Sequence, residues 1–477
     1  MGTEKPHKKR RKIAVWRILL LLFLFTLLGG LSLALYASYH PASEENTALE
    51  SATTGQEQPE TPPRVMRTDL PDPKVPIEDL PDEPFEYPVT VMAVGDNLMH
   101  MGVVYTGRQD DGTYNYECLY ESIADFLGLA DIKIINQETV MAGNQLGFSG
   151  YPYFNSPVEV ADGIAAAGFN VVLQASNHSC DQGIEGIDYC VSVWEKHPEV
   201  LMVGLHSGAS DAISAEGELP QTTESENRAD VTSASDQMSA REIPILEIDG
   251  VNFAILNYTY APNSGYMPPE VQKRLEVLCN YNRKTGRMDY TTINPQVLED
   301  IKQADEIADA VIVCPHWGTE YSTTASSYQK KFALQMTEAG ADVIIGAHPH
   351  VVEPVEWITA ENGNEALCFY SLGNYVSTQK DCISMLEAMA WVTFIVHEEG
   401  DTRTVTLSHT GSGAIPLVCQ YSSSPVRIKG VFPLETYTEE QAAAHGIKSY
   451  GNGVLHLEEL KKWCEEILGD AVLPVPY

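Results

Sequence analysis

Seven short, almost uninterrupted apolar runs constrain the fold of this chain more than any other feature of its sequence. The runs are 89–94, 132–135, 170–174, 253–256, 310–314, 343–345 and 367–370. Apolar runs of this length, without polar alternation, are typical of strands that are covered on both faces. We therefore expect an α/β layered domain whose strands are covered on both faces.

Helical patterns lie between the apolar runs. The clearest covers 156–168, where Ser156 and Glu159 predict a capping box and Gly168 predicts the stop. Further helices are expected at 297–309, 327–339 and 456–468. The runs 388–398 and 403–409 alternate between apolar and polar residues, which predicts a hairpin and hence some antiparallel sheet.

Polar side chains that bind metals follow five of the predicted strands. They are Asp96 with His100, Asn136 with Glu138, Asn177 with His178, His316, and His348 with His350. One such residue after a strand is usually a cap or a turn residue, but five segments in the same position are not. Because ligands bind beyond the carboxyl ends of strands in open α/β sheets, we expect these side chains to converge. Imidazole, carboxylate and amide ligands without thiolate favour Mn, Fe or Zn.

The ordered series of motifs resembles one protein family. The segments are VGDNLMH, INQE, AAAGFNVVLQASNHSCDQG, PHWGTEY, GAHPHV and FYSLGNY, over about residues 89–378. Together they resemble the CapA family of poly-γ-glutamate capsule biosynthesis proteins. That family looks like a branch of the calcineurin-like metallophosphoesterases. The resemblance implies a four-layer α/β sandwich with one or two divalent metal ions.

The resemblance also implies a role for each motif residue. It makes metal ligands of six side chains: Asp96, Glu138 in the bridging place, Asn177, His316, His348 and His350. It makes His178 the histidine that assists catalysis, with Asp181 as the carboxylate behind it. Leu98 stands where the superfamily has a histidine, and His100 is the expected substitute. The usual Gly-Asp motif is replaced by Asn136-Gln137-Glu138, so one ion and two ions both remain open.

Charge and hydropathy predict where the chain lies. The chain has 66 acidic and 30 basic residues, a net charge of −36, which argues against a nucleic-acid partner. Residues 1–17 are nevertheless basic, and residues 18–39 are uncharged and apolar. At about 1.5 Å per residue, the apolar segment is long enough to cross a bilayer core of about 30 Å. The basic tail predicts a cytoplasmic N-terminus and an extracytoplasmic main domain, with a cleaved signal peptide as the alternative.

Composition predicts the remaining organisation. Residues 40–84 and 206–241 are rich in Pro, Glu, Ser and Thr, which indicates a disordered stalk and a disordered insertion. The main domain is expected at 85–440 and a helical extension at 441–477. The nine cysteines contain no CxxC pair, so most are expected to be buried thiols, with Cys180–Cys190 as an alternative disulfide.

Two functions of different class are consistent with the sequence. The first is a metal-dependent hydrolase that acts outside the membrane on an anionic wall or capsule polymer, or on its lipid-linked precursor. The second is a non-catalytic subunit that binds the polymer beside a membrane capsule synthase. A structural domain with a degenerate site is less consistent, because burying so many polar side chains without a partner is costly.

Overall fold

Three segments of the chain are described by the computed structural model: residues 85–208, 242–400 and 402–476. The predicted tail, apolar segment and stalk lie outside these residues, as does most of the predicted insertion. Within the described segments, no helix has the length and apolar character needed to cross a membrane.

The largest sheet has nine strands and is built around β1. The four neighbours β1, β2, β3 and β4 run parallel, because each is joined to the next by a crossover segment. On the other side of β1, strands β14, β16 and β17 follow as antiparallel neighbours. The strands are β1 (Phe85–Asn97), β2 (Ile132–Asn136), β3 (Val171–Leu173), β4 (Leu201–Val203), β13 (Asn374–Val376), β14 (Leu386–Glu399), β15 (Thr402–Leu407), β16 (Gly413–Ser423) and β17 (Val426–Pro433).

The second sheet has six strands in the order β11-β12-β10-β9-β6-β5, and its four central strands are parallel. A separate hairpin consists of β7 and β8. The strands are β5 (Ile245–Ile248), β6 (Val251–Thr259), β7 (Cys279–Tyr281), β8 (Met288–Ile293), β9 (Ala310–His316), β10 (Val343–Ile345), β11 (Val355–Thr359) and β12 (Glu365–Phe369). All seven apolar runs of the sequence are thus strands, and the mixed α/β class is confirmed.

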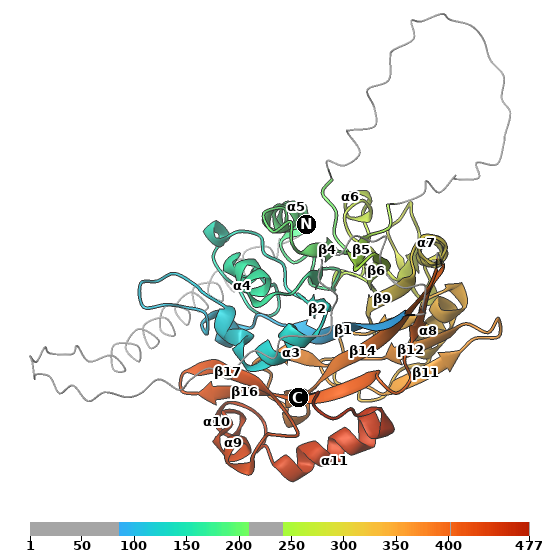
Figure 1. Cartoon of the computed structure of the whole chain (residues 1–477). Helices are drawn as coiled ribbons and strands as arrows, with labels where there is room; N and C mark the ends of the chain where they lie inside the picture. The colour runs from blue at the N-terminus through green and yellow to red at the C-terminus, as the bar shows by residue number, and fades with distance from the viewer. Residues whose placement is uncertain (1–84, 209–241, 401, 477) are drawn as a thin grey trace, which may run out of the picture. The chain divides into compact units, whose positions relative to one another are not determined.

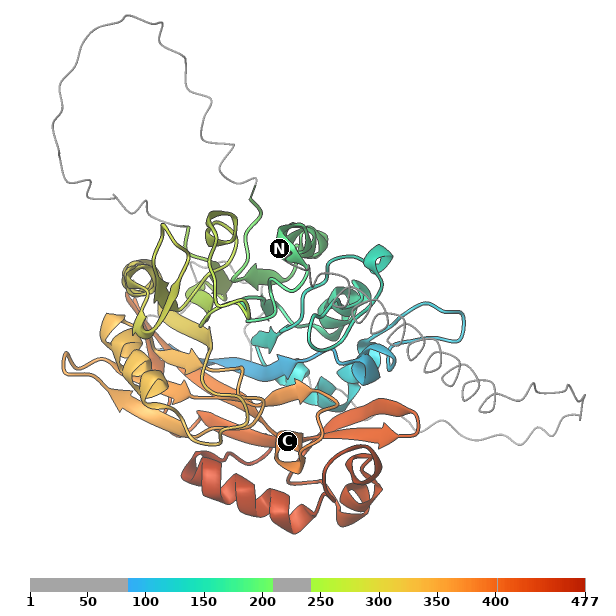
Figure 2. The ribbon, with the colours of Figure 1, turned by 180° about the vertical axis from the view of Figure 1, so that it is seen from behind.

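Helices cover the sheets from several sides (Figure 1). Helices α7 and α8 pack on the six-stranded sheet, whereas α10 and α11 pack on β16 and β14 (Figure 2). The helices are α2 (Met101–Val104), α3 (Ala124–Leu129), α4 (Glu159–Ala167), α5 (Gly183–Trp194), α6 (Pro269–Gln272), α7 (Pro295–Ile307), α8 (Ser327–Ala339), α9 (Glu439–Ala444), α10 (Ile447–Tyr450) and α11 (Leu457–Leu468). The four helices expected from the sequence correspond to α4, α7, α8 and α11.

The predicted start of α4 is wrong. The helix begins at Glu159, and no side chain caps it. The Ser156 hydroxyl lies 2.7 Å from the Thr139 hydroxyl, and the Glu159 carboxylate accepts a hydrogen bond from Asn144. Both predicted capping groups therefore bind a neighbouring loop, and tertiary contacts override the local pattern. The predicted stop is confirmed, because Gly168 ends the helix with a left-handed φ of 93°.

The two large sheets share one apolar core. Phe253 of β6 and Phe394 of β14 meet across it with ring centroids 5.4 Å apart, and both are almost fully buried. Deleting a buried aromatic ring removes apolar contacts and leaves a cavity. We expect Phe394→Ala to lower the free energy of unfolding by about 3–5 kcal/mol in urea titrations. Phe85→Ala is the control, because Phe85 is 51% exposed and should cost less than about 0.5 kcal/mol. Equal costs for the two variants would contradict this account of the core.

Six of the nine cysteines are buried, and all nine are free thiols. The alternative disulfide between Cys180 and Cys190 is therefore not formed. Both thiols have a raised pKa of about 12 because they are buried, which keeps them protonated and unreactive.

Candidate metal centre

The predicted site residues lie together at the carboxyl ends of strands from both large sheets. Asp96 is near the end of β1, Glu138 follows β2, and His316 ends β9. Asn177 and His178 follow β3, and His348 and His350 follow β10. The backbones approach closely here: a Cβ on Gly95 would lie 2.0 Å from the Gly373 carbonyl oxygen, so only glycine fits. The convergence expected from the strand ends is what the fold produces.

Two groups of ligand atoms share one carboxylate. The first group is Glu138, His316 and His348, and the second is Asp96, Glu138 and His350. Within each group the ligand atoms lie within 4.8 Å of one another, and all these residues are buried. Asn177 belongs beside the first group, because its Oδ1 lies 2.8 Å from His316 Nε2. Glu138 thus occupies the bridging place between two clusters.

Glu138 is the strongest evidence that a cation belongs here. Both of its carboxylate oxygens are buried and have no hydrogen-bond partner among the described residues. Its oxygens lie 3.8 Å from His316 Nε2 and 3.8 Å from His350 Nδ1, which is too far for a hydrogen bond. Burial raises the pKa of Glu138 well above its ordinary value, although the charge of His350 opposes the rise. A buried carboxylate without a partner is costly unless a cation compensates it.

Two of the three histidines, His316 and His348, are in the neutral state that metal binding requires. Burial, together with the other histidines, holds the pKa of His316 and of His348 well below the ordinary value, so both are neutral imidazoles. His348 Nδ1 is buried and has no partner among the described residues. For His350 burial also lowers the pKa, but Glu138 and Asp96 outweigh it and raise it to about 9. His350 is therefore charged next to the two carboxylates, in the place that a cation would take.

Asp96 fixes the loop that presents the paired histidines. Its Oδ2 accepts hydrogen bonds from the backbone N–H of His348 at 3.3 Å and from His350 Nδ1 at 3.0 Å. Both histidines have a left-handed backbone, with φ of 99° and 60°, which costs a residue with a Cβ about 1–3 kcal/mol. Backbone strain of this kind persists only where the surrounding structure enforces it, and strained residues are common at functional sites.

His178 and Asp181 form a pair at the rim of the two groups. The His178 Nδ1 lies 2.7 Å from Asp181 Oδ2, which also accepts the Phe154 backbone N–H at 2.8 Å. The other ring nitrogen of His178, Nε2, lies 4.0 Å from Glu138 Oε1. Burial alone would lower the pKa of His178, but Asp181 and Glu138 raise it above the ordinary value. The turn between the two residues thus brings the predicted carboxylate into contact with its histidine.

His100 is near the site, but it belongs to neither group of ligand atoms among the described residues. The centroid of its ring lies 5.7 Å from that of Phe154, and the Phe154 centroid lies 4.7 Å from that of His178. Its Nδ1 is buried and has no partner within the described part of the chain, and burial, with the nearby His350 and His178, lowers its pKa to about 3. His100 is therefore a neutral imidazole at the rim, where it can contact a substrate.

Asn263 is a site residue that the sequence interpretation missed. Its amide nitrogen lies 3.1 Å from His178 Nδ1, and its Oδ1 accepts a hydrogen bond from Asn177 at 3.0 Å. It follows β6, at the same position relative to a strand as the other site residues. The sequence did carry a signal for Asn263. The run 253–256 predicts a strand, and no polar residue after that strand was assigned to the site.

Two tyrosines also flank the paired histidines. The Tyr260 ring centroid lies 4.8 Å from that of His348, and the Tyr321 centroid lies 6.0 Å from that of His350.

Asn374 of β13 borders the site, because it pairs with Asp96 in the sheet and its amide donates to the His350 carbonyl oxygen at 3.1 Å. The SLGNY segment thus bounds the site through Asn374.

An α/β fold with two carboxylate–histidine groups at its strand ends defines a candidate metalloprotein. The donor set of imidazole, carboxylate and amide oxygen, together with the unpartnered oxygens of Glu138, fits divalent Mn, Fe or Zn.

Comparison with known proteins identifies the family. The chain belongs to the family of the bacterial capsule synthesis protein PGA_cap, whose model matches residues 90–216 and 221–379. The chain is 28% identical over 212 residues to the PGA biosynthesis protein CapA of Bacillus subtilis (strain 168), covering 44% of this chain and 43% of that protein. It is also 28% identical over 302 residues to the capsule biosynthesis protein CapA of Bacillus anthracis, covering 61% of this chain and 60% of that protein.

Among solved structures, a phosphatase from Mycoplasma pneumoniae aligns with a TM-score of 0.37 and 14% identity, over 70% of this chain and 95% of that one. The chain thus spans 43% and 60% of the lengths of its two CapA relatives.

Proposed function

We propose that this protein is a metal-dependent hydrolase of capsule or cell-envelope polymer synthesis. In this proposal the main domain is a four-layer sandwich of the metallophosphoesterase type, held outside the cell membrane by residues 18–39. Its substrate is an anionic polymer such as poly-γ-glutamate, or its lipid-linked precursor, and its partners are subunits of a membrane capsule synthase. The observation that supports it best is the bridging place of Glu138, whose two buried oxygens face separate histidine groups and have no hydrogen-bond partner in the described segments.

The residues present divide the chemical work. Glu138, His316, His348 and Asn177 would hold one ion, and Asp96, Glu138 and His350 would hold the other. Bound ions of this kind supply Lewis acidity and a water of lowered pKa. Asp181 accepts the Nδ1 proton of His178, which fixes the ring with Nε2 toward the site. His178 can therefore hold a proton at Nε2 and deliver it to the leaving-group oxygen or nitrogen.

The assay that tests turnover uses the purified full chain in non-ionic detergent, loaded with Mn, Fe or Zn. Chromogenic phosphodiesters and γ-glutamyl amides are the first substrates. We expect metal-dependent release of product, which stops after chelation and returns with added metal. Bound metal without turnover of either substrate class would contradict the proposed hydrolase activity.

One observation favours a non-catalytic polymer-binding subunit as the second candidate. Leu98 replaces the histidine of the metallophosphoesterase pattern, and His100 does not join either group among the described residues. A site that has lost this histidine can hold an anionic polymer through a bound cation without cleaving it. Polymer binding that needs metal, together with the absence of turnover, would select this function.

A further inference from the structure

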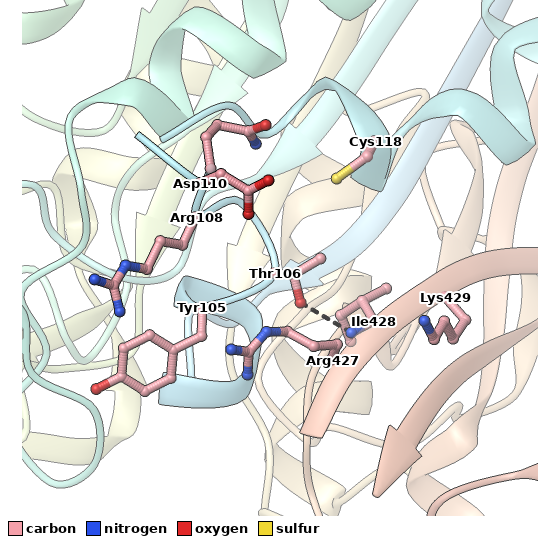
Figure 3. Close-up of a pocket in the computed structure, with 9 residues that line it drawn as sticks. Tyr105, Thr106, Arg108, Asp110, Cys118, Arg427, Ile428 and Lys429 are labelled. Atoms are coloured by element: carbon pink, nitrogen blue, oxygen red, sulfur yellow. Dashed lines mark hydrogen bonds between the residues drawn. The ribbon is translucent and has the colours of Figure 1, made fainter. Parts of the chain in front are cut away.

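A second polar site lies where the loop after α2 meets strand β17. It is a pocket of about 570 Å³. We call it the basic pocket, after the cations Arg108, Arg427 and Lys429 that line it. Figure 3 shows the guanidinium groups of Arg108 and Arg427 on the Tyr105 side of the pocket and the Lys429 ammonium on the other side. The cations therefore face the pocket from two sides.

The three cations have no carboxylate partner among the described residues. The paired arginines show the contrast: Arg274 lies 2.7 Å from Asp188 and Arg403 lies 2.6 Å from Glu398. One acid, Asp110, also lines the pocket, which leaves the lining net positive. Three cations without a carboxylate partner among the described residues line this one pocket in a chain with 66 acidic and 30 basic residues, so the pocket offers charge for an anionic ligand; the Arg427 guanidinium donates one hydrogen bond, to the Val426 carbonyl oxygen at 2.7 Å.

The pocket is held in shape by contacts between its two segments. The Thr106 hydroxyl accepts the Ile428 backbone N–H at 2.9 Å, which joins the loop to β17. Arg427 is half-buried and lies 5.3 Å from the centroid of the Tyr105 ring, a cation–π contact that limits its motion. A guanidinium fixed in this way loses less entropy when it binds an anion.

Lys429 owes its orientation to a β-bulge. In the ladder of β16 and β17, Gln420 pairs with Gly430 and Tyr421 with Ile428, so Lys429 has no residue opposite it. Strand β17 is the edge of its sheet, and bulges at edges turn side chains toward sites. Lys429 and Arg427 are two residues apart in this strand, so their Cα atoms lie at most about 7 Å from each other. Such spacing suits repeated charges along a chain better than one compact anion.

One short helix connects the basic pocket to the metal centre. His100 is the residue before α2, and Tyr105 is the residue after it. At about 1.5 Å per residue, the two lie roughly 8 Å apart along the helix axis. The distance between His100 and the basic pocket is therefore within the span of a few residues of an extended polymer.

We propose that the basic pocket binds carboxylates of an extended anionic chain whose neighbouring segment lies over the metal centre. Arg427 and Arg108 present planar donors that match a carboxylate, and Lys429 binds the next charge as a point cation. The inference deepens the proposed function by assigning a binding site for the polymer away from the metal centre, and it rests on that function for the reaction, whereas binding itself needs no turnover. The pocket thus supplies affinity and register for a polymer that the acidic remainder of the surface repels.

The test measures how a fluorescent oligo-γ-glutamate binds to the full chain, by fluorescence anisotropy. We expect Arg427→Gln with Lys429→Gln to weaken binding about tenfold, because each lost charge-assisted contact is worth roughly 0.7 kcal/mol or more. Arg283→Gln with Lys284→Gln is the matched control, because it removes the same two charges from exposed positions of the β7–β8 turn. This control should change affinity less than about twofold. Higher salt should weaken oligomer binding to the wild type and reduce the difference in affinity between the wild type and the Arg427 and Lys429 variant.

Further variants and ligands distinguish a failure of polymer binding at the basic pocket from a failure of the proposed hydrolase function. His348→Ala with His350→Ala removes metal ligands, and it should still bind the oligomer in the presence of chelator if the basic pocket acts alone. Unchanged binding in the Arg427 and Lys429 variant, or equal losses in that variant and its control, would overturn the inference. Binding of polyphosphate but not of oligo-γ-glutamate would also overturn it. If the double variant does not fold, Lys429→Gln alone at its exposed position gives the same comparison.

Discussion

Glu138→Gln should remove all bound metal from the purified protein, as measured by elemental analysis. Glu138 is the one carboxylate that both groups of ligand atoms share, and its oxygens have no other partner among the described residues. The amide keeps the shape of the side chain but loses the charge that binds both ions. His348→Ala and His350→Ala each disrupt one group only, so each should retain roughly half of the wild-type metal if two ions bind independently.

The same variant should lose stabilisation by metal. A metal present at 100 times its dissociation constant raises the free energy of unfolding by about 2.7 kcal/mol, because it binds the folded state only. Glu138→Gln should show no such increase, because its amide does not supply the charge that binds the metal. Glu353→Gln is the matched control: Glu353 is also buried, but it bonds to Gln329 at 2.5 Å and lies in neither group. Loss of metal in the control as well would contradict the assignment.

His178→Ala should lower kcat about 10²–10⁴-fold while the metal content stays at the wild-type value. His178 is not among the two groups of ligand atoms, and its Nε2 points into the site from the Asp181 side. Removing a positioned proton donor costs this much in general acid catalysis. The measurement combines steady-state kinetics with elemental analysis of the same preparation.

Asp181→Asn tests the positioning of the His178 ring separately. The ring remains, but the carboxylate that accepts its Nδ1 proton is lost, so kcat should fall by about 10–100-fold. KM should change much less, because Asp181 lies behind His178 and not in the site. Wild-type kcat in His178→Ala would exclude this histidine from catalysis, and a rise in KM alone would indicate a role in substrate binding.

The strands were predictable because burial on both faces leaves a clear apolar signature in the sequence. The seven runs became strands for this reason, and the helix expected at 327–339 matches α8 at both ends. Its capping box forms because the Gln329 amide oxygen remains available to accept the Ser326 backbone N–H, while the Gln329 amide nitrogen donates to Glu353. At α4 the same type of signal failed, because Ser156 found a partner in Thr139. Local rules hold where no tertiary contact offers the capping group an alternative.

The metal centre was predictable because strand order determines where side chains meet. Asp96, Glu138 and His316 each lie at the end of a parallel strand, and the carboxyl ends of such strands lie at one edge. Asn263 was missed because it lies in a turn without a recognised motif, although it follows β6 at the same distance as Asn177 follows β3.

The basic pocket was not predictable from sequence. Arg108 and Arg427 are far apart in the chain, and Lys429 depends on a bulge that no local pattern indicates. The contact between α2 and β17 brings these residues together.

The central claim is that Glu138 bridges a divalent metal centre, and anomalous diffraction from crystals of the metal-loaded protein tests it most directly. Data collected at the absorption edges of Mn, Fe and Zn locate each ion without assumptions about the ligands. The account predicts an anomalous peak at about 2.0–2.2 Å from Glu138 and from at least one of His316, His348 and His350. A metal-loaded crystal with no peak there, or with peaks only at other places on the protein, would contradict it.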